Sequence, residues 1–154
     1  MISFTVDTTQ LEKTVLKVKG KQAKWSKEYL PRLAALIAAD AKYEVQVEAP
    51  VRSGVLQRGI STQIKLGATS ATINGYSSAP YTRFVIEGTR PHIIRAVNGR
   101  VLHWQSGGED RFAAYVHHPG TKPNDFVERG LRKIEPLVEE HMRLVGEELL
   151  DFNV

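Results

Sequence analysis

Four histidines fall in the middle of the chain, and imidazole nitrogens are among the commonest metal ligands in proteins. They are His92, His103, His117 and His118. Because His117 and His118 are adjacent, their side chains would point to opposite faces of a strand and could not both serve one site. The sequence also contains no HExxH pair. We therefore expect histidines that hydrogen-bond the backbone and no metal site.

Arginines gather in the same segment. They are Arg83, Arg90, Arg95, Arg100 and Arg111, with Trp104 among them. Basic side chains beside an aromatic ring can follow a nucleic-acid backbone. Acidic residues in the segment reduce its net charge, however, and a dedicated nucleic-acid binder is usually more basic. A nucleic-acid-binding or metal-dependent DNA-processing protein is therefore kept as the alternative.

No other pattern indicates catalysis. The sequence has no cysteine, which excludes disulfides, thiolate metal sites and a cysteine nucleophile. It also lacks a phosphate-binding glycine loop, a dinucleotide fingerprint and a Gly-x-Ser-x-Gly elbow. We expect a protein that is not an enzyme and that holds no cofactor.

Length and composition indicate one soluble intracellular domain spanning residues 1–154. The apolar fraction of 42% and the charged fraction of 25% are typical of globular proteins, and this length can bury a core. No apolar run approaches the roughly 20 residues of a membrane span. The first residues do not form an export signal.

Charge is distributed unevenly along the chain. Residues 13–27 are rich in lysine, and residues 135–151 are rich in glutamate. Opposite poles suit head-to-tail contacts between subunits, although solvated helix faces are the alternative. The candidate contact residues are Lys17, Lys24, Glu139 and Glu147.

Apolar spacing predicts a long core helix that ends near Glu48, before Pro50, with Pro31 in its first turn. Its inward residues are expected to be Trp25, Tyr29, Leu33, Leu36, Ile37 and Ala41. A short strand over residues 2–6 and a brief helix carrying the apolar residues of 11–18 should precede it. Two helical pieces, split near Pro136, should end the chain.

Strand patterns dominate the middle. Alternation from Leu56 to Leu66 predicts a half-buried strand that turns back at Gly67-Ala68 into residues 69–76. Proline at position 80 and glycine at position 88 favour a short helix between them. Its inward residues would be Tyr81, Phe84 and Val85.

Asn98-Gly99 is a strong tight-turn signal, which predicts a hairpin of His92–Val97 with Arg100–Gln105. A third strand should cover residues 112–117. The hairpin has few residues to bury, so we expect it to project as an arm used in assembly. The candidate contact residues of the arm are Arg90, Arg95, Asn98, Gly99 and Arg100.

These elements together predict an α+β fold. A long helix and C-terminal helices would pack on a small antiparallel sheet, with a projecting β-hairpin or loop.

Four blocks of sequence, in order, carry a family resemblance. They are Ala49-Pro50-Val51-Arg52-Ser53-Gly54-Val55-Leu56, Ala79-Pro80-Tyr81, Glu87-Gly88-Thr89-Arg90-Pro91-His92-Ile93-Ile94, and His117-His118-Pro119-Gly120-Thr121-Lys122-Pro123. The chain resembles the gene-product-ten-like head-to-tail joining proteins (neck or tail-completion proteins) of tailed double-stranded DNA phages. The match covers residues 49–130, and the order of the blocks is more specific than any one of them.

The resemblance implies a structural virion protein at the head–tail junction, assembled in the host cytoplasm. It implies a homo-oligomeric ring, a hexamer in the virion, between the head connector or head-completion protein and the tail tube or tail terminator protein. DNA would pass through the ring without specific binding, and no membrane would be involved. No catalysis is implied.

Overall fold

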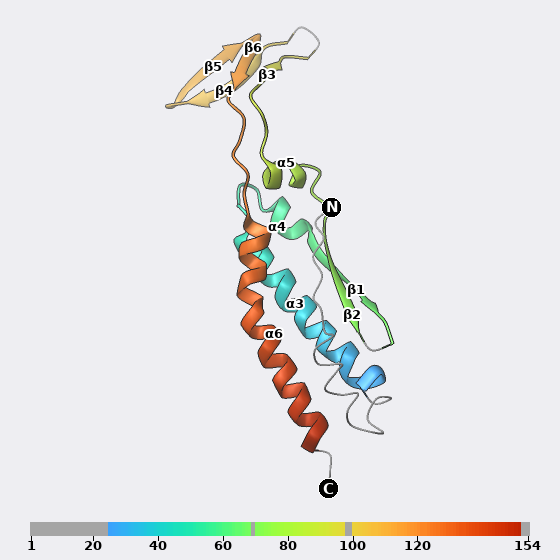
Figure 1. Ribbon diagram of the computed structural model, residues 1–154. Helices are drawn as coiled ribbons and strands as arrows, with labels where there is room; N and C mark the ends of the chain where they lie inside the picture. The colour runs from blue at the N-terminus through green and yellow to red at the C-terminus, as the bar shows by residue number, and fades with distance from the viewer. Residues whose placement is uncertain (1–24, 69, 98–99, 152–154) are drawn as a thin grey trace. The chain divides into compact units, whose positions relative to one another are not determined.

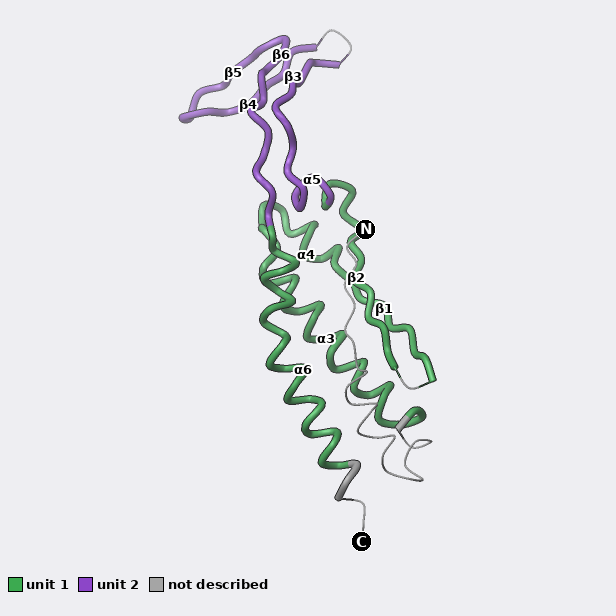
Figure 2. Tube along the Cα trace, viewed as in Figure 1, with its two compact units in different colours: residues 1–82, 125–154 green, residues 83–124 purple. Residues whose placement is uncertain are grey.

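The computed structural model describes residues 25–68, 70–97 and 100–151, and its fold is α+β (Figure 1). The chain divides into two compact units, one of residues 1–82 with 125–154 and one of residues 83–124 (Figure 2). The prediction of a single domain stays a prediction. The strand expected over residues 2–6 and the helix expected over 11–18 lie outside the described residues. Within the described part, no helix is long and apolar enough to cross a membrane.

Helix α3 (Leu30–Glu48) is the centre of the first unit, and a π-helical turn, η1 (Trp25–Tyr29), leads into it. Proline at position 31 lies in the first turn, where no backbone N–H is needed, and the helix ends at Glu48 as predicted. The buried face comprises Tyr29, Leu30, Leu33, Ala34, Ile37, Ala38, Ala41 and Val45. Leu36 was expected to join it but is exposed, because it lies about 100° around the helix from Ile37.

An antiparallel pair of strands, β1 (Ile60–Leu66) and β2 (Ala71–Ser77), packs on α3. Ile60 and Ile73 are buried between the strands and the helix. The hydroxyl of Thr62 donates to the carbonyl of Ala38 at 3.3 Å. The predicted return of the chain at Gly67-Ala68 is confirmed.

The strand does not begin at Leu56, as the alternation suggested, because residues Val55–Gly59 form the short helix α4. Gly54 takes the left-handed conformation (φ 72°) that precedes this helix. Two side-chain amides then fix α4 on α3: Gln46 Nε2 donates to the Gln57 carbonyl at 2.9 Å, and Gln57 Nε2 donates to the Gln46 carbonyl at 3.0 Å. The long-range amide contacts override the local period-two pattern.

Helix α6 (Phe126–Asp151) is continuous, so the break predicted near Pro136 is wrong. A proline inside a helix leaves the carbonyl four residues earlier, that of Arg132, without its donor. Both residues are exposed, so water can hydrate that carbonyl. Packing of α6 against α3 holds the helix together across the defect.

The backbones of α3 and α6 nearly touch at Gly130, which is buried. A Cβ atom built at Gly130 would lie 2.7 Å from Val45 Cα and 2.8 Å from Val45 N. Backbone atoms cannot rotate out of the way as a side chain can. The close approach of the two helices therefore requires glycine at this position.

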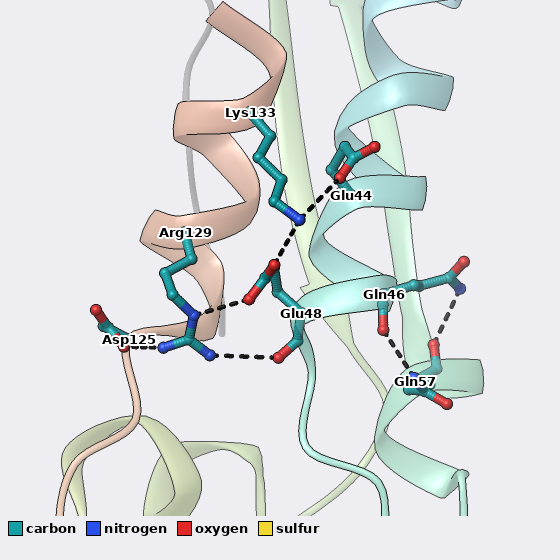
Figure 3. A network of polar contacts seen from close by, with 7 residues as sticks. All are labelled: Glu44, Gln46, Glu48, Gln57, Asp125, Arg129 and Lys133. Carbon is teal, nitrogen blue, oxygen red and sulfur yellow. Dashed lines mark hydrogen bonds and ion pairs between the residues drawn. The ribbon is translucent and has the colours of Figure 1, made fainter.

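Polar contacts join α3 and α6 along their whole interface, which we call the seam. They pair residues in opposite order along the two helices, so the helices are antiparallel. The pairs are Arg32 with Glu148, Asp40 with His141, Glu44 with Lys133, and Glu48 with Arg129 and Lys133. Figure 3 shows the end of the seam near Glu48, where Arg129 also pairs with Asp125.

Glu48 joins two cations of α6. Its carboxylate accepts from Lys133 Nζ at 2.6 Å and from Arg129 Nε at 2.8 Å. Hydrogen bonds from Lys133 and then Arg129 lower the pKa of the Glu48 carboxyl. The contacts lie within one helical turn of Gly130, so the close approach and the ion pairs reinforce each other.

Replacing Gly130 with alanine tests the close approach. In a solvent-exposed helix interior, glycine-to-alanine replacement stabilises the folded protein by up to about 1 kcal/mol. At Gly130 the added Cβ would push Val45 away and should lower the unfolding free energy by about 1–3 kcal/mol. Urea unfolding measures the difference. The exposed control Glu135→Ala should change the unfolding free energy by less than about 0.5 kcal/mol. A stabilised Gly130→Ala protein would contradict the packing described for the seam.

Glu48→Gln should lower the melting temperature at pH 7. A carboxyl whose pKa is lowered on folding stabilises the protein above the unfolded pKa, and that contribution is lost as the pH falls. The difference between the wild type and Glu48→Gln should therefore shrink below about pH 4. Melting curves from pH 7 to pH 3 measure it, and a constant difference would mean that the charge of Glu48 contributes nothing.

Candidate functional site

The four strands of the second unit form two antiparallel pairs. Strand β3 (His92–Arg95) pairs with β6 (Tyr115–His118), and β4 (Leu102–Ser106) pairs with β5 (Glu109–Ala113). An isolated bridge between Thr89 and Thr121 extends the first pair in the same register. The chain runs outward through β3 and β4 and returns through β5 and β6, so the two pairs lie one after the other along one double-stranded segment. We call this segment, residues 89–121, the ribbon.

A short insertion separates the two halves of the ribbon. From Arg95 to Leu102 the first stretch of chain advances seven residues, whereas its partner moves only two, from Tyr115 to Ala113. The Ala96 amide still donates to the Ala114 carbonyl at 3.1 Å. The five extra residues are therefore 97–101, and the ladder is regular on either side of them.

The predicted hairpin of His92–Val97 with Arg100–Gln105 is wrong. The tip of the ribbon is Gly107-Gly108, with φ angles of 63° and 82°, and a two-residue type I′ turn needs positive φ at both positions. A turn bond from the Arg100 amide to the Val97 carbonyl (3.3 Å) closes within the insertion instead. Asn98 and Gly99 lie outside the described residues. The predicted strand over residues 112–117 is split at Ala114 into β5 and β6.

Two glycines let the strands meet at the base of the ribbon. Gly88 and Gly120 have φ angles of 72° and 86°, and a Cβ atom on either would come within 2.4 Å of a backbone carbonyl oxygen across the ribbon. Thr89 and Thr121 exchange amide-to-carbonyl hydrogen bonds at 3.0 and 3.1 Å between them. Any side chain at these glycines would separate the two stretches of chain.

The second unit has little interior of its own. Of the residues described between Arg83 and Asn124, none is buried. The exposed fractions of its large apolar residues include 64% for Phe112, 52% for Tyr115 and 45% for Ile93. Helix α5 (Thr82–Glu87) is present as expected, but Phe84 and Tyr81, both predicted to face inward, are 58% and 39% exposed. A two-stranded ribbon is marginally stable alone, so its apolar surface is available for contacts.

His92, His103 and His118 make backbone or carboxylate contacts. His92 Nδ1 donates to the Arg90 carbonyl at 2.9 Å, and His118 Nδ1 accepts from the Gly120 amide at 3.0 Å. His103 Nε2 lies 2.9 Å from Asp110 Oδ1. The first two contacts confirm the expectation of histidines bonded to the backbone.

His92 and His118 face each other across the ribbon, with ring centroids 5.0 Å apart. They line a hollow of about 360 Å³ together with Pro91, Ile93, His117 and Pro119. Because His118 Nδ1 accepts a hydrogen bond, the neutral ring carries its proton on Nε2, the atom a metal would need. Among the described residues no group of three or more potential ligands could hold a metal ion.

The predicted contact residues fall into three groups. Arg90, Arg95 and Arg100 are exposed in the ribbon. Lys17 and Lys24 lie outside the described residues, with Asn98 and Gly99. Glu139 and Glu147 are exposed on α6, but Glu147 is paired with Arg143 of the same helix at 2.7 Å. Arg143 therefore neutralises part of the negative charge of residues 135–151.

Sequence reasoning missed two features. The α3 side of the α3–α6 seam, Asp40, Glu44 and Glu48, repeats every four residues, a spacing that marks one helix face. The second feature is the pairing of the ribbon: Gly107-Gly108 at its tip is a turn signal in the sequence, but no pattern indicated that β3 pairs with β6.

Comparison of the chain with protein-family models, with curated proteins and with solved structures finds no match.

Zinc should leave the melting temperature unchanged. A ligand stabilises a protein only when it prefers the folded state, and metal binding at His92 and His118 would have to move the proton from His118 Nε2 and find further ligands. Thermal melts with and without micromolar ZnCl₂ measure this. A rise of several degrees that is absent in His118→Ala would overturn the structural role of the histidines.

Proposed function

We propose that the chain is a structural virion protein of the phage head–tail junction, a neck or tail-completion protein that forms a ring between the head connector and the tail. The proposal treats the protein as a non-enzyme. Its partners would be further copies of itself, a head-completion or connector protein, and a tail tube or terminator protein. Localisation in the virion belongs to the same proposal.

The observation that carries the proposal is the second unit: an extended ribbon, with none of its described residues buried, whose apolar side chains face solvent. Enzymes place their reactive groups in concave pockets; the ribbon has a hollow lined by His92 and His118, but most of its described surface is exposed strand. Exposed apolar residues in such number mark a surface that other proteins cover. Assembly is the function that such a surface serves.

The blocks of family resemblance support the proposal because their glycines lie at a helix start and at a close contact between strands. Gly54 precedes α4 in its left-handed conformation, and Gly88 and Gly120 allow the close approach at the base of the ribbon. These glycines have a structural explanation that needs no active site, which agrees with the proposed non-enzymatic role.

Nucleic-acid binding is the second candidate, and one observation favours it. Arg95 Cζ lies 5.7 Å from the centroid of the Tyr115 ring, an arrangement that offers a cation and an aromatic face side by side. An electrophoretic shift assay with single- and double-stranded DNA at two salt concentrations separates the candidates. Specific binding that Arg95→Ala removes would favour the second candidate.

Deleting residues 97–101 tests the proposed role of the ribbon. The ladder is regular on both sides of the insertion, and Ala96 would then be followed by Leu102, whose partner Ala113 adjoins Ala114. We expect a folded protein with a nearly unchanged melting curve but unjoined heads and tails. The deletion removes two exposed valines and Arg100, which supply contact surface.

Complementation of a phage lacking the gene, with electron microscopy of the particles, measures joining. The wild-type gene is the positive control, and circular dichroism of the purified deletion protein shows whether it folds. Normal yields of infectious particles from a folded deletion protein would remove this segment from the assembly surface.

A further inference from the structure

The two halves of the ribbon differ in charge. The half that contains β3 and β6, residues 89–96 with 114–121, carries Arg90 and Arg95 and no acidic residue. The half at the tip, residues 102–113, carries Glu109 and Asp110 against Arg111. One end of the ribbon is therefore positive and the other is slightly negative.

Both halves have free strand edges. In the described structure each strand of the ribbon has one partner, so the outer edges of β3 and β5 carry backbone N–H and C=O groups that no ladder uses. Such an edge is a template for a further strand, and strand addition provides main-chain hydrogen bonds.

Exposed apolar residues lie on both of these strands. Ile93 and Ile94 belong to β3, and Phe112 belongs to β5. Three strands with a shared apolar face are stable where two are marginal. Neighbouring residues of a strand point to opposite faces, so a contact between β3 and β5 would bring one of the two isoleucines onto the same face as Phe112 and use the free edges together.

The acids of the tip can change partners at little cost. Glu109 pairs with Arg111 at 2.8 Å and Asp110 with His103 at 2.9 Å, and all four side chains are more than half exposed. Exposed pairs of this kind contribute about 0–1 kcal/mol. Arginines of another molecule can therefore compete for them.

We propose that β5 of one copy adds to the free edge of β3 of the next copy, with Asp110 near Arg95. The inference rests on the proposed ring and identifies one of its contacts. The two surfaces differ, so the contact is heterologous and each copy uses both of its ends, which is the arrangement that closes into a ring. The opposite charges of the two halves favour a second copy of this chain as the occupant.

Engineered cysteines test the contact directly, because the chain has no native cysteine. The double variant Ile93→Cys/Phe112→Cys places one thiol on each strand. Within one copy Ile93 lies opposite His117, five residues along the strand from Phe112, or about 16 Å, whereas a disulfide needs Cα atoms within about 7 Å. Any disulfide between these positions must therefore join two copies.

The double variant would be oxidised in purified phage particles and resolved on a non-reducing gel. We expect a ladder of multimers, and only monomer from the matched variant Glu135→Cys/Phe112→Cys, whose first thiol is exposed on α6. If the particles contain the chain but the gel shows no ladder, the inference is overturned and the proposed function still holds.

A chain absent from particles would instead contradict the proposed function. The purified double variant, oxidised at high concentration, then decides the inference by itself: a ladder supports the β5–β3 contact, and monomer alone overturns it. The two failures are therefore distinguishable.

Charge exchange gives an independent test. Arg95→Glu and Asp110→Arg should each lower the yield of the ladder about two- to five-fold, as the loss of one exposed pair would, and the two together should restore most of it. Lys65→Glu, a reversal at an exposed lysine of β1, should have no effect. Equal yields from the single and double reversals would exclude pairing between these two residues.

Discussion

The near-contact of α3 and α6 at Gly130 is the constraint on which the first unit depends. With the backbones of the two helices this close at Val45, the side chains on either side can pair along the whole seam. Glu48 then reaches Arg129 and Lys133 at one end, and Arg32 reaches Glu148 at the other. Glycine in a helix is unfavourable by itself, so its presence here reflects the packing that it permits. The seam also keeps α6 helical through Pro136.

The described part of the second unit is held together by main-chain pairing and not by a buried core. Its glycines serve close strand contacts and a tight turn, and no described residue in it is buried. Folding of the first unit is supported by a core, whereas the ribbon has main-chain pairing and little else. A segment built in this way gains stability when another molecule covers it. The division between a stable body and an interface element suits a protein that functions by assembling.

The α+β class, the extent of α3 and the return of the chain into β2 could be predicted from periodicity and from the positions of prolines. The predictions were wrong where contacts between residues distant in sequence determine the secondary structure or the strand pairing. The amide contacts between Gln46 and Gln57 fix a helical turn where the alternation suggested a strand. The ribbon pairs residues of β3 with residues of β6 that are 20 to 26 positions away in sequence, and turn chemistry at Asn98-Gly99 does not indicate such a partner. Phe84 was expected to face inward but is exposed, because an apolar residue type does not by itself indicate burial.

We propose that this chain forms a closed ring between the head and the tail of a phage, and cryo-electron microscopy of intact virions that contain it tests the proposal. We expect a ring of density at the junction into which copies of the first unit fit, with the ribbon of each copy against its neighbour. Virions whose junction contains no density for this chain would contradict it.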